Sequence, residues 1–222
     1  DRLEADGWRA AEVAIDAIAS RCAEPDAGIW ELEPAWWAHS RLACVAGLRA
    51  VSGQSPETLA DRALALADAI LAEVGRTCVH PSGRWQRARD DDRVDASLLL
   101  GEVRGATRSD DPRAVATRAA VVEELSDDQY VYRYLPRGTS LGEGEGAFLI
   151  CNFWMTLACL GDARTIEAAR WFERARGSCG SPGLFSEEYD VEHHQLRGNL
   201  PQAFVHALLI EAAAHPGWNR GR

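Results

Sequence analysis

The sequence contains no lysine. All 24 of its basic residues are arginine, in a chain of 222 residues. Schiff-base chemistry and a lysine nucleophile, both of which need an amine side chain, are therefore excluded. Positive charge is also in the minority, because the formal net charge is −10 and the isoelectric point is about 5.1. A nucleic-acid partner, which needs a basic surface to displace counterions from phosphates, is not expected.

Long hydrophobic runs are absent as well. No stretch approaches the ~20 apolar residues of a membrane span, and no signal-peptide pattern opens the chain, so no membrane partner is expected. The cysteines form no CxxC pair, and several lie in apolar, helix-like sequence, which indicates reduced structural thiols and a cytoplasmic location. They are Cys22, Cys44, Cys78, Cys151, Cys159 and Cys179.

What the sequence does contain favours helices. Apolar residues make up 46% and charged residues 26% of the chain, with many Ala, Leu, Arg and Glu, which are good helix formers. Three helices are marked by a capping residue, Ser55, Asp111 or Asp162, and extend to about residues 75, 125 and 177. Further helices are expected near residues 3–21, 34–52, 93–104, 144–160 and 200–214. The sequence thus predicts an all-α fold in one domain.

Two local features depart from this pattern. The alternating run Tyr130–Tyr134 is rich in strand-forming residues and predicts a short strand within a loop. The first residues, DRLEADGW, begin inside a helix-like pattern without a methionine, so we expect the chain to be part of a longer protein.

Two acidic segments suggest chemistry. GIWE at residues 28–31 and SEEYD at residues 186–190 each place an acid beside an aromatic residue, at an expected helix boundary. Hydrolysis of a glycosidic bond needs two carboxyl groups in different environments, together with aromatic surface that holds the sugar ring. Taken alone, either segment is a weak signal, because an acid near a helix start is usually a partner for the helix dipole or a solvated cap.

Both segments belong to an ordered series along nearly the whole chain. It comprises GIWEL with a following HSR, VDASLLL, DDPR, YVYRY, GEGAFLICNFW, LFSEEYD and GNLPQAFVHALLI. In this order it resembles the catalytic domains of glycoside hydrolase family 15, the glucoamylases with related trehalases and glucodextranases. The resemblance implies an (α/α)6 toroid of twelve helices in two layers. Residues 1–222 would form the C-terminal part of this single domain, with about eight of the helices.

The resemblance also implies a function and catalytic residues. The family hydrolyses α-glucosides with inversion and releases glucose from non-reducing ends. In this sequence Glu31 would be the general acid and Glu187 the general base. Arg133 matches a sugar-binding arginine, while Trp30 and Tyr189 would shape the walls of the pocket.

Other parts of the expected site are less direct. Glu188 is expected either to support the catalytic carboxylates or to be a solvated acid at a helix start. Asp95 is expected to be structural, either as a helix cap or as a tie between layers. No cofactor or metal is expected. The expected partners are a disaccharide or oligosaccharide and the N-terminal part of the same domain, whose Trp-Leu-Arg-Asp segment at the glucose subsite is missing from this sequence.

Two other functions remain open. The run Asp91–Asp95 fits the DDxxD pattern with which prenyl and terpene synthases hold Mg²⁺ and a diphosphate on an all-α fold, because acids four residues apart share a helix face. Alternatively, the chain is a non-catalytic half-toroid for carbohydrate binding or assembly, with an exposed apolar face.

Overall fold

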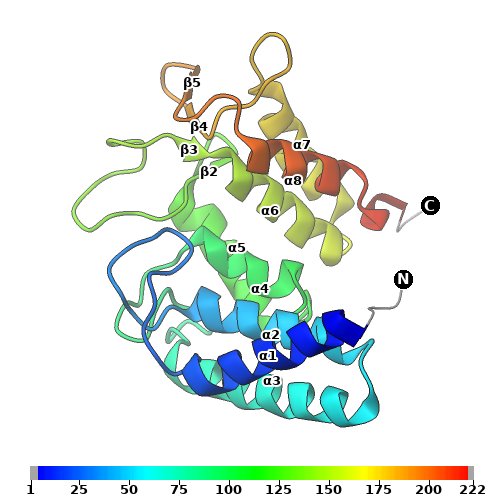
Figure 1. Ribbon diagram of the computed structural model, residues 1–222. Coiled ribbons are helices and arrows are strands. Elements are labelled where there is room, and N and C mark those ends of the chain that lie inside the picture. Colours follow the sequence, from blue (N-terminus) through cyan, green and yellow to red (C-terminus); the bar gives the residue numbers. More distant parts are fainter. Residues whose placement is uncertain (1–4, 220–222) are drawn as a thin grey trace.

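A computed structural model describes residues 5–219, which fold mainly into helices (Figure 1). The α-helices of this part of the chain are α1 (Ala5–Arg21), α2 (Ala38–Ser52), α3 (Glu57–Thr77), α4 (Leu100–Val103), α5 (Pro112–Leu125), α6 (Leu149–Gly161), α7 (Thr165–Gly177) and α8 (Ala203–Ala213). Two 3₁₀ helices, η1 (Ala96–Leu99) and η2 (Pro216–Asn219), accompany them. The first residues of the helix expected at 3–21 lie outside the described part.

The helices form two layers. Helices α2, α4, α6 and α8 contact one another in this order, while α1 and α3 pack on α2, α5 packs on η1, and α7 packs on α6. Helix α6 is apolar on all sides and almost completely buried, as its sequence LICNFWMTLACLG requires. In Figure 1, loops 22–37 and 132–146 project from the same side of the stack.

Four expected helices begin later than the sequence pattern predicts. The residues before them are extended, because their backbone groups pair with other segments. Trp37 pairs with Ala88 just before α2, and Asp95 pairs with Tyr134 just before η1. Residues 147–148 form a strand directly before α6, and α8 begins only after Pro201 and Gln202.

Small sheets correct the all-α expectation. Strands β1 (Ser126–Asp127) and β2 (Tyr130–Val131) form a hairpin, so only the first half of the expected strand at 130–134 is a regular strand. Strands β3 (Ala147–Phe148), β4 (Glu188–Asp190) and β5 (Gln195–Arg197) form an antiparallel sheet in the order β3-β4-β5. This sheet brings the segment after Glu187 beside the segment before α6, which are far apart in the sequence.

The three expected caps have different outcomes. Asp111 caps α5 as expected, because its side chain accepts a hydrogen bond from the Arg113 amide at 2.8 Å. Ser55 does not cap α3, whose first residue is Glu57, and its hydroxyl instead contacts the Ser52 carbonyl. Asp162 does not open α7 either.

Asp162 instead follows α6 and joins a buried ionic cluster. Arg118 on α5 donates to Asp162 at 2.6 Å and also to Glu102 on α4. Arg118 and Glu102 are almost completely buried, so this cluster ties three helices together. Burial raises the pKa of Glu102 to about 8, although Arg118 opposes this shift.

The cysteines of the described residues are all free thiols, and three of them, including Cys159, are buried. Cys44, which lies in the apolar segment LACVAGL, is only half-buried. Within residues 5–219, no helix combines the length and apolar character that crossing a bilayer requires.

Candidate active site

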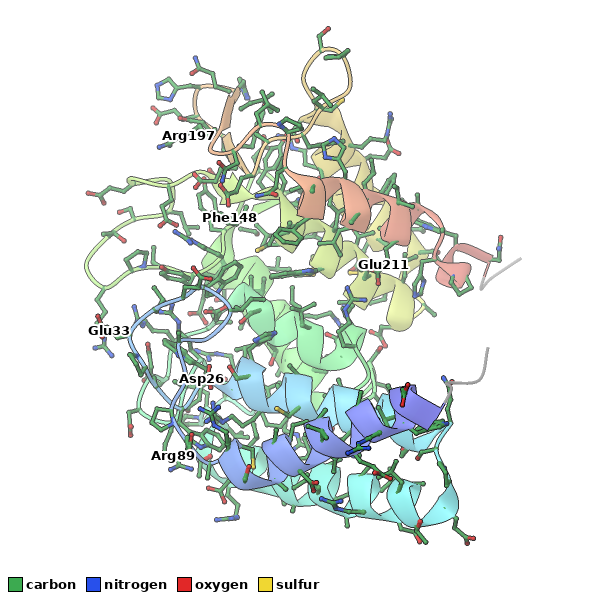
Figure 2. All side chains as sticks on the ribbon, viewed as in Figure 1. Asp26, Glu33, Arg89, Phe148, Arg197 and Glu211 are labelled. Atoms are coloured by element: carbon green, nitrogen blue, oxygen red, sulfur yellow. The ribbon has the colours of Figure 1, made fainter. Side chains whose placement is uncertain are left out.

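A cleft of about 790 Å³ brings together Trp30, Glu31, Arg133 and Glu187. The two acids come from distant segments, since Glu31 lies in the loop after α1 and Glu187 lies just before β4. Residues of α4, α6 and α8 form much of the remaining wall. Phe148 and Glu211, which both line the cleft, are labelled in Figure 2.

Glu31 lies in a tight turn. The turn is closed by the Leu32 amide, which donates to the Ala27 carbonyl at 2.8 Å, and Glu31 itself has a positive φ of 51°. Such a backbone conformation is uncommon outside glycine and is found disproportionately at functional sites. The Glu31 side chain is exposed and accepts no hydrogen bond from the described residues. Its carboxyl group is therefore accessible from the cleft.

The Trp30 side chain is held by the buried carboxylate of Asp95. Its Nε1 donates to both oxygens of Asp95, at 3.0 and 3.1 Å, and its ring contacts the rings of Phe148 and Trp154. Gly28, two residues earlier, has a φ of +69°, and a side chain there would meet the Trp37 ring at 2.9 Å. The turn that carries Glu31 is therefore held at both ends.

Asp95 acts both as a cap and as a tie, as expected. It is only 2% exposed, accepts from the Ser97 amide and hydroxyl at the start of η1, and has Arg87 Nε 3.0 Å away. His39 on α2 lines a small pocket together with Asp95 and Arg87, and burial lowers the pKa of its imidazole. Asp95 thus joins the floor of the cleft to the helical layers.

Glu187 is held by donors from one loop. Its Oε2 accepts from Asn199 Nδ2 at 3.0 Å, and Gln202 Nε2 lies 3.5 Å from Oε1. An ionised carboxylate only accepts hydrogen bonds, so it can satisfy these donors together. Gly198 lets the loop approach closely, since a Cβ there would lie 2.9 Å from Glu187 Oε2.

Arg133 enters the cleft with its orientation already fixed. Its Nε donates to Glu145 Oε2 at 2.8 Å, and its Nη2 donates to the other oxygen of the same carboxylate. The guanidinium lies 4.6 Å from the centre of the Phe148 ring. The bonds to Glu145 raise the pKa of Arg133 above its ordinary value.

Glu188 and Tyr189 are not among the residues that line this cleft. Glu188 belongs to β4 rather than to a helix start, and its Oε2 accepts from the Gly146 amide at 2.8 Å. The Tyr189 ring stacks on Tyr130 with ring centres 4.7 Å apart. The structure thus places both residues in the supporting sheet, although Tyr189 was expected in the pocket wall.

The acidic run at residues 91–95 does not form one helical face, because the helix begins only at Ala96. Asp91 pairs with Arg93, whereas Asp95 is buried with Trp30 and Arg87. Among residues 5–219, no group of three or more His, Cys, Asp or Glu side chains is placed to hold a metal ion. The structure therefore does not favour the DDxxD interpretation.

Sequence reasoning missed Asn199 and Gln202 as supporting residues. Asn199 and Gln202 lie in the GNLPQ segment, which contributed to the resemblance but received no role. No local pattern marks such residues, because their hydrogen bonds join separate loops.

Two carboxylates from distant segments that share an aromatic-walled cleft are typical of glycoside hydrolases. Residues 1–214 match the model of "Glycosyl hydrolases family 15", and the chain belongs to this family. A trehalase of Mycolicibacterium smegmatis is 32% identical over 216 residues, and one of Mycobacterium tuberculosis is 33% identical over 216 residues. Each alignment covers 94% of this chain, which spans only about a third (32%) of these relatives.

Solved structures share the fold. A wild-type glycosidase superimposes with a TM-score of 0.84 at 21% identity, covering 98% of this chain and 62% of that chain. A variant glycosidase in complex with glucose gives a TM-score of 0.83 at 21% identity, covering 95% of this chain and 60% of that chain. At this identity the likeness establishes the helical fold alone.

Proposed function

We propose that the protein containing this chain is an inverting α-glucoside hydrolase, with Glu31 as general acid and Glu187 as general base. One observation carries the proposal: these two acids, from opposite ends of the chain, line a single cleft. The family to which the chain belongs supports the same reaction class.

The reaction would use the two carboxyl groups in different protonation states. Glu31, protonated, gives its proton to the glycosidic oxygen as the bond to the anomeric carbon breaks. Glu187, ionised, takes a proton from a water molecule, whose oxygen attacks the anomeric carbon from the opposite face. Inverting enzymes hold the two groups roughly 6.5–9.5 Å apart to leave room for this water. The orientation of Glu187 by Asn199 and Gln202 suits this role.

The substrate we propose is α,α-trehalose. The curated relatives from two mycobacterial species are named trehalases, and a structural neighbour is described as a complex with glucose. Trehalose joins two glucose units through both anomeric carbons. Inversion at the attacked carbon gives one β-glucose, and the leaving unit keeps its α configuration. Glucose release from a non-reducing end, expected from the resemblance, is the same exo-type cleavage in a longer glucoside.

We also propose that other helices of the same protein complete the (α/α)6 toroid around this cleft. Two helical layers and an open cleft agree with a partial toroid, in which residues 1–222 belong to one domain. The greater length of the relatives leaves room for the missing helices. A cytoplasmic location is supported by the free thiols, since reducing compartments keep cysteines unpaired.

The test is hydrolysis of trehalose by the full-length protein, with the anomers of the first-formed glucose followed by NMR. We expect equal initial amounts of α- and β-glucose. Glu31→Gln and Glu187→Gln should each lower kcat by about 100-fold or more, as general acid–base catalysis predicts. Glu33→Gln, at an exposed acid of the same loop as Glu31, is the matched control. Two α-glucose products, or full activity in either variant, would overturn the assignment.

A further inference from the structure

We infer that Glu145 is a positioning residue, which sets the direction of Arg133 in the cleft. The inference rests on the proposed function, because it takes Arg133 as a residue that binds the sugar in that reaction. Glu145 itself receives no role from the resemblance or from the comparisons. Glu145 is the last acid of the GEGEG segment and does not itself line the cleft.

Glu145 holds Arg133 through two hydrogen bonds. A guanidinium carries five N–H donors in one plane, and Glu145 takes one from Nε and one from Nη2. Such a side-on pair fixes both the direction and the plane of the fork, which a single hydrogen bond does not. Nη1 has no hydrogen-bond partner among the described residues and points away from Glu145. Because Arg133 lines the cleft, these remaining donors are available for sugar hydroxyls.

Glu145 is itself held in place by the sheet. The next residue, Gly146, donates its amide to Glu188 Oε2 at 2.8 Å, and β3 begins immediately afterwards. A Cβ at Gly146 would lie 2.8 Å from the Tyr189 carbonyl oxygen, so this close approach depends on glycine. Glu188 and Tyr189 thus fix the end of the loop that carries Glu145.

Aromatic rings complete the support. The guanidinium carbon of Arg133 lies 4.6 Å from the Phe148 ring centre, 5.2 Å from that of Tyr134 and 5.8 Å from that of Trp30. These rings restrict movement of the guanidinium group as a whole, but they do not fix its rotation within its own plane. The carboxylate supplies that selection, and binding sites supported in this way lose less order when substrate arrives.

A purely structural ion pair is the alternative to a positioning role. Both side chains are partly exposed, at 21% for Arg133 and 31% for Glu145, and exposed pairs stabilise a fold little. Loss of Glu145 should therefore leave folding almost unchanged and alter substrate binding. This contrast separates the two roles.

The experiment measures trehalose hydrolysis by the full-length protein with Glu145→Gln and with Glu143→Gln as control. Glu143 belongs to the same loop but bonds the Ser140 amide instead of Arg133. We expect Glu145→Gln to lower kcat/KM by about 10-fold or more, mainly through a higher KM, since misplaced groups lose binding. Glu143→Gln should change kcat/KM less than about 2-fold, within the range of surface substitutions. Glu145→Asp, which keeps the charge, should recover part of the loss.

A double-mutant cycle makes the test specific. If Glu145 acts only through Arg133, Glu145→Gln should have almost no further effect in an Arg133→Ala background, because coupled residues are not additive. The same fold-loss in both backgrounds, or no loss in the wild-type background, would overturn the inference. If Glu145→Gln causes no loss in the wild-type background, but wild-type activity depends on Glu31 and Glu187, the proposed function still holds. An inactive wild type overturns both.

Discussion

The indole nitrogen of Trp30 lies 3.0 and 3.1 Å from the two carboxylate oxygens of Asp95, which is 65 positions further along the chain. This contact joins the loop that carries Glu31 to the start of η1. Asp95 also lies 3.0 Å from Nε of Arg87, which is only 4% exposed. One buried carboxylate therefore orients an aromatic wall and balances a buried cation.

The first prediction concerns this carboxylate. Asp95→Asn removes the nearer of the two carboxylates beside the buried Arg87 and leaves only Asp91, 3.8 Å from its Nη1. Removal of one partner from a buried ion pair costs about 3 kcal/mol of unfolding free energy. Urea denaturation of the full-length protein measures the change. Asp92→Asn, at an exposed position three residues earlier, should change the unfolding free energy by less than about 0.5 kcal/mol. Equal effects of the two substitutions would show that Asp95 stabilises the fold no more than an exposed acid does.

A second prediction concerns pH. Burial raises the pKa of Glu102 to about 8 from its ordinary 4.5, so between these values the folded state binds more protons than the unfolded state. A group that is protonated more strongly when folded makes stability fall as pH rises. The contribution of Glu102 to the free energy of unfolding is therefore complete below about pH 4.5 and is lost as pH rises through about 8.

Glu102→Gln should remove this pH dependence. In the middle of the window the wild type should lose up to about 1.4 kcal/mol of unfolding free energy per pH unit relative to the variant. Glu123→Gln, at an exposed acid of α5, should keep the wild-type slope. Parallel curves for wild type and Glu102→Gln would mean that Arg118 keeps the Glu102 carboxylate ionised throughout.

The sequence predicts much of the helical framework, because caps and apolar periodicity are local signals. Asp111 illustrates this, since both its capping role and the helix after it were predictable. The start of α6 was not, because Ala147 and Phe148 have no strand pattern of their own and are extended only through their pairing with β4. Tertiary pairing of this kind decides several helix starts.

The candidate site shows the same division. Trp30, Glu31, Arg133 and Glu187 belong to segments recognised by resemblance, and all four line the cleft. Glu188 was assigned beside Glu187 without knowledge of the strand. Because side chains alternate along a strand, neighbouring acids there turn to opposite faces, and Glu188 instead reaches Gly146.

A third prediction concerns the core. Phe153 on α6 is fully buried and contacts the rings of Phe172 and Phe185 edge-on. Phe153→Ala should lower the unfolding free energy by about 3–5 kcal/mol through lost burial and a cavity. Phe204→Ala removes the same ring from α8 at a position that is 72% exposed, and should cost less than about 1 kcal/mol. Comparable losses would mean that other helices of the protein bury Phe204.

The last prediction separates backbone strain from displacement of Glu187, the proposed general base. Gly198 and Gly183 have positive φ angles of +72° and +95°, so alanine is strained at both positions. Each substitution should cost about 1–2 kcal/mol of unfolding free energy.

Only at Gly198 would the new methyl group meet Glu187, at 2.9 Å from Oε2, whereas nothing lies within 4 Å at Gly183. Gly198→Ala should therefore lower kcat for trehalose by on the order of 100-fold, as expected for a misplaced catalytic group, and Gly183→Ala should leave kcat nearly unchanged. Steady-state kinetics at a temperature where both variants are folded makes the comparison, and equal kcat values would show that the position of Glu187 does not limit the reaction.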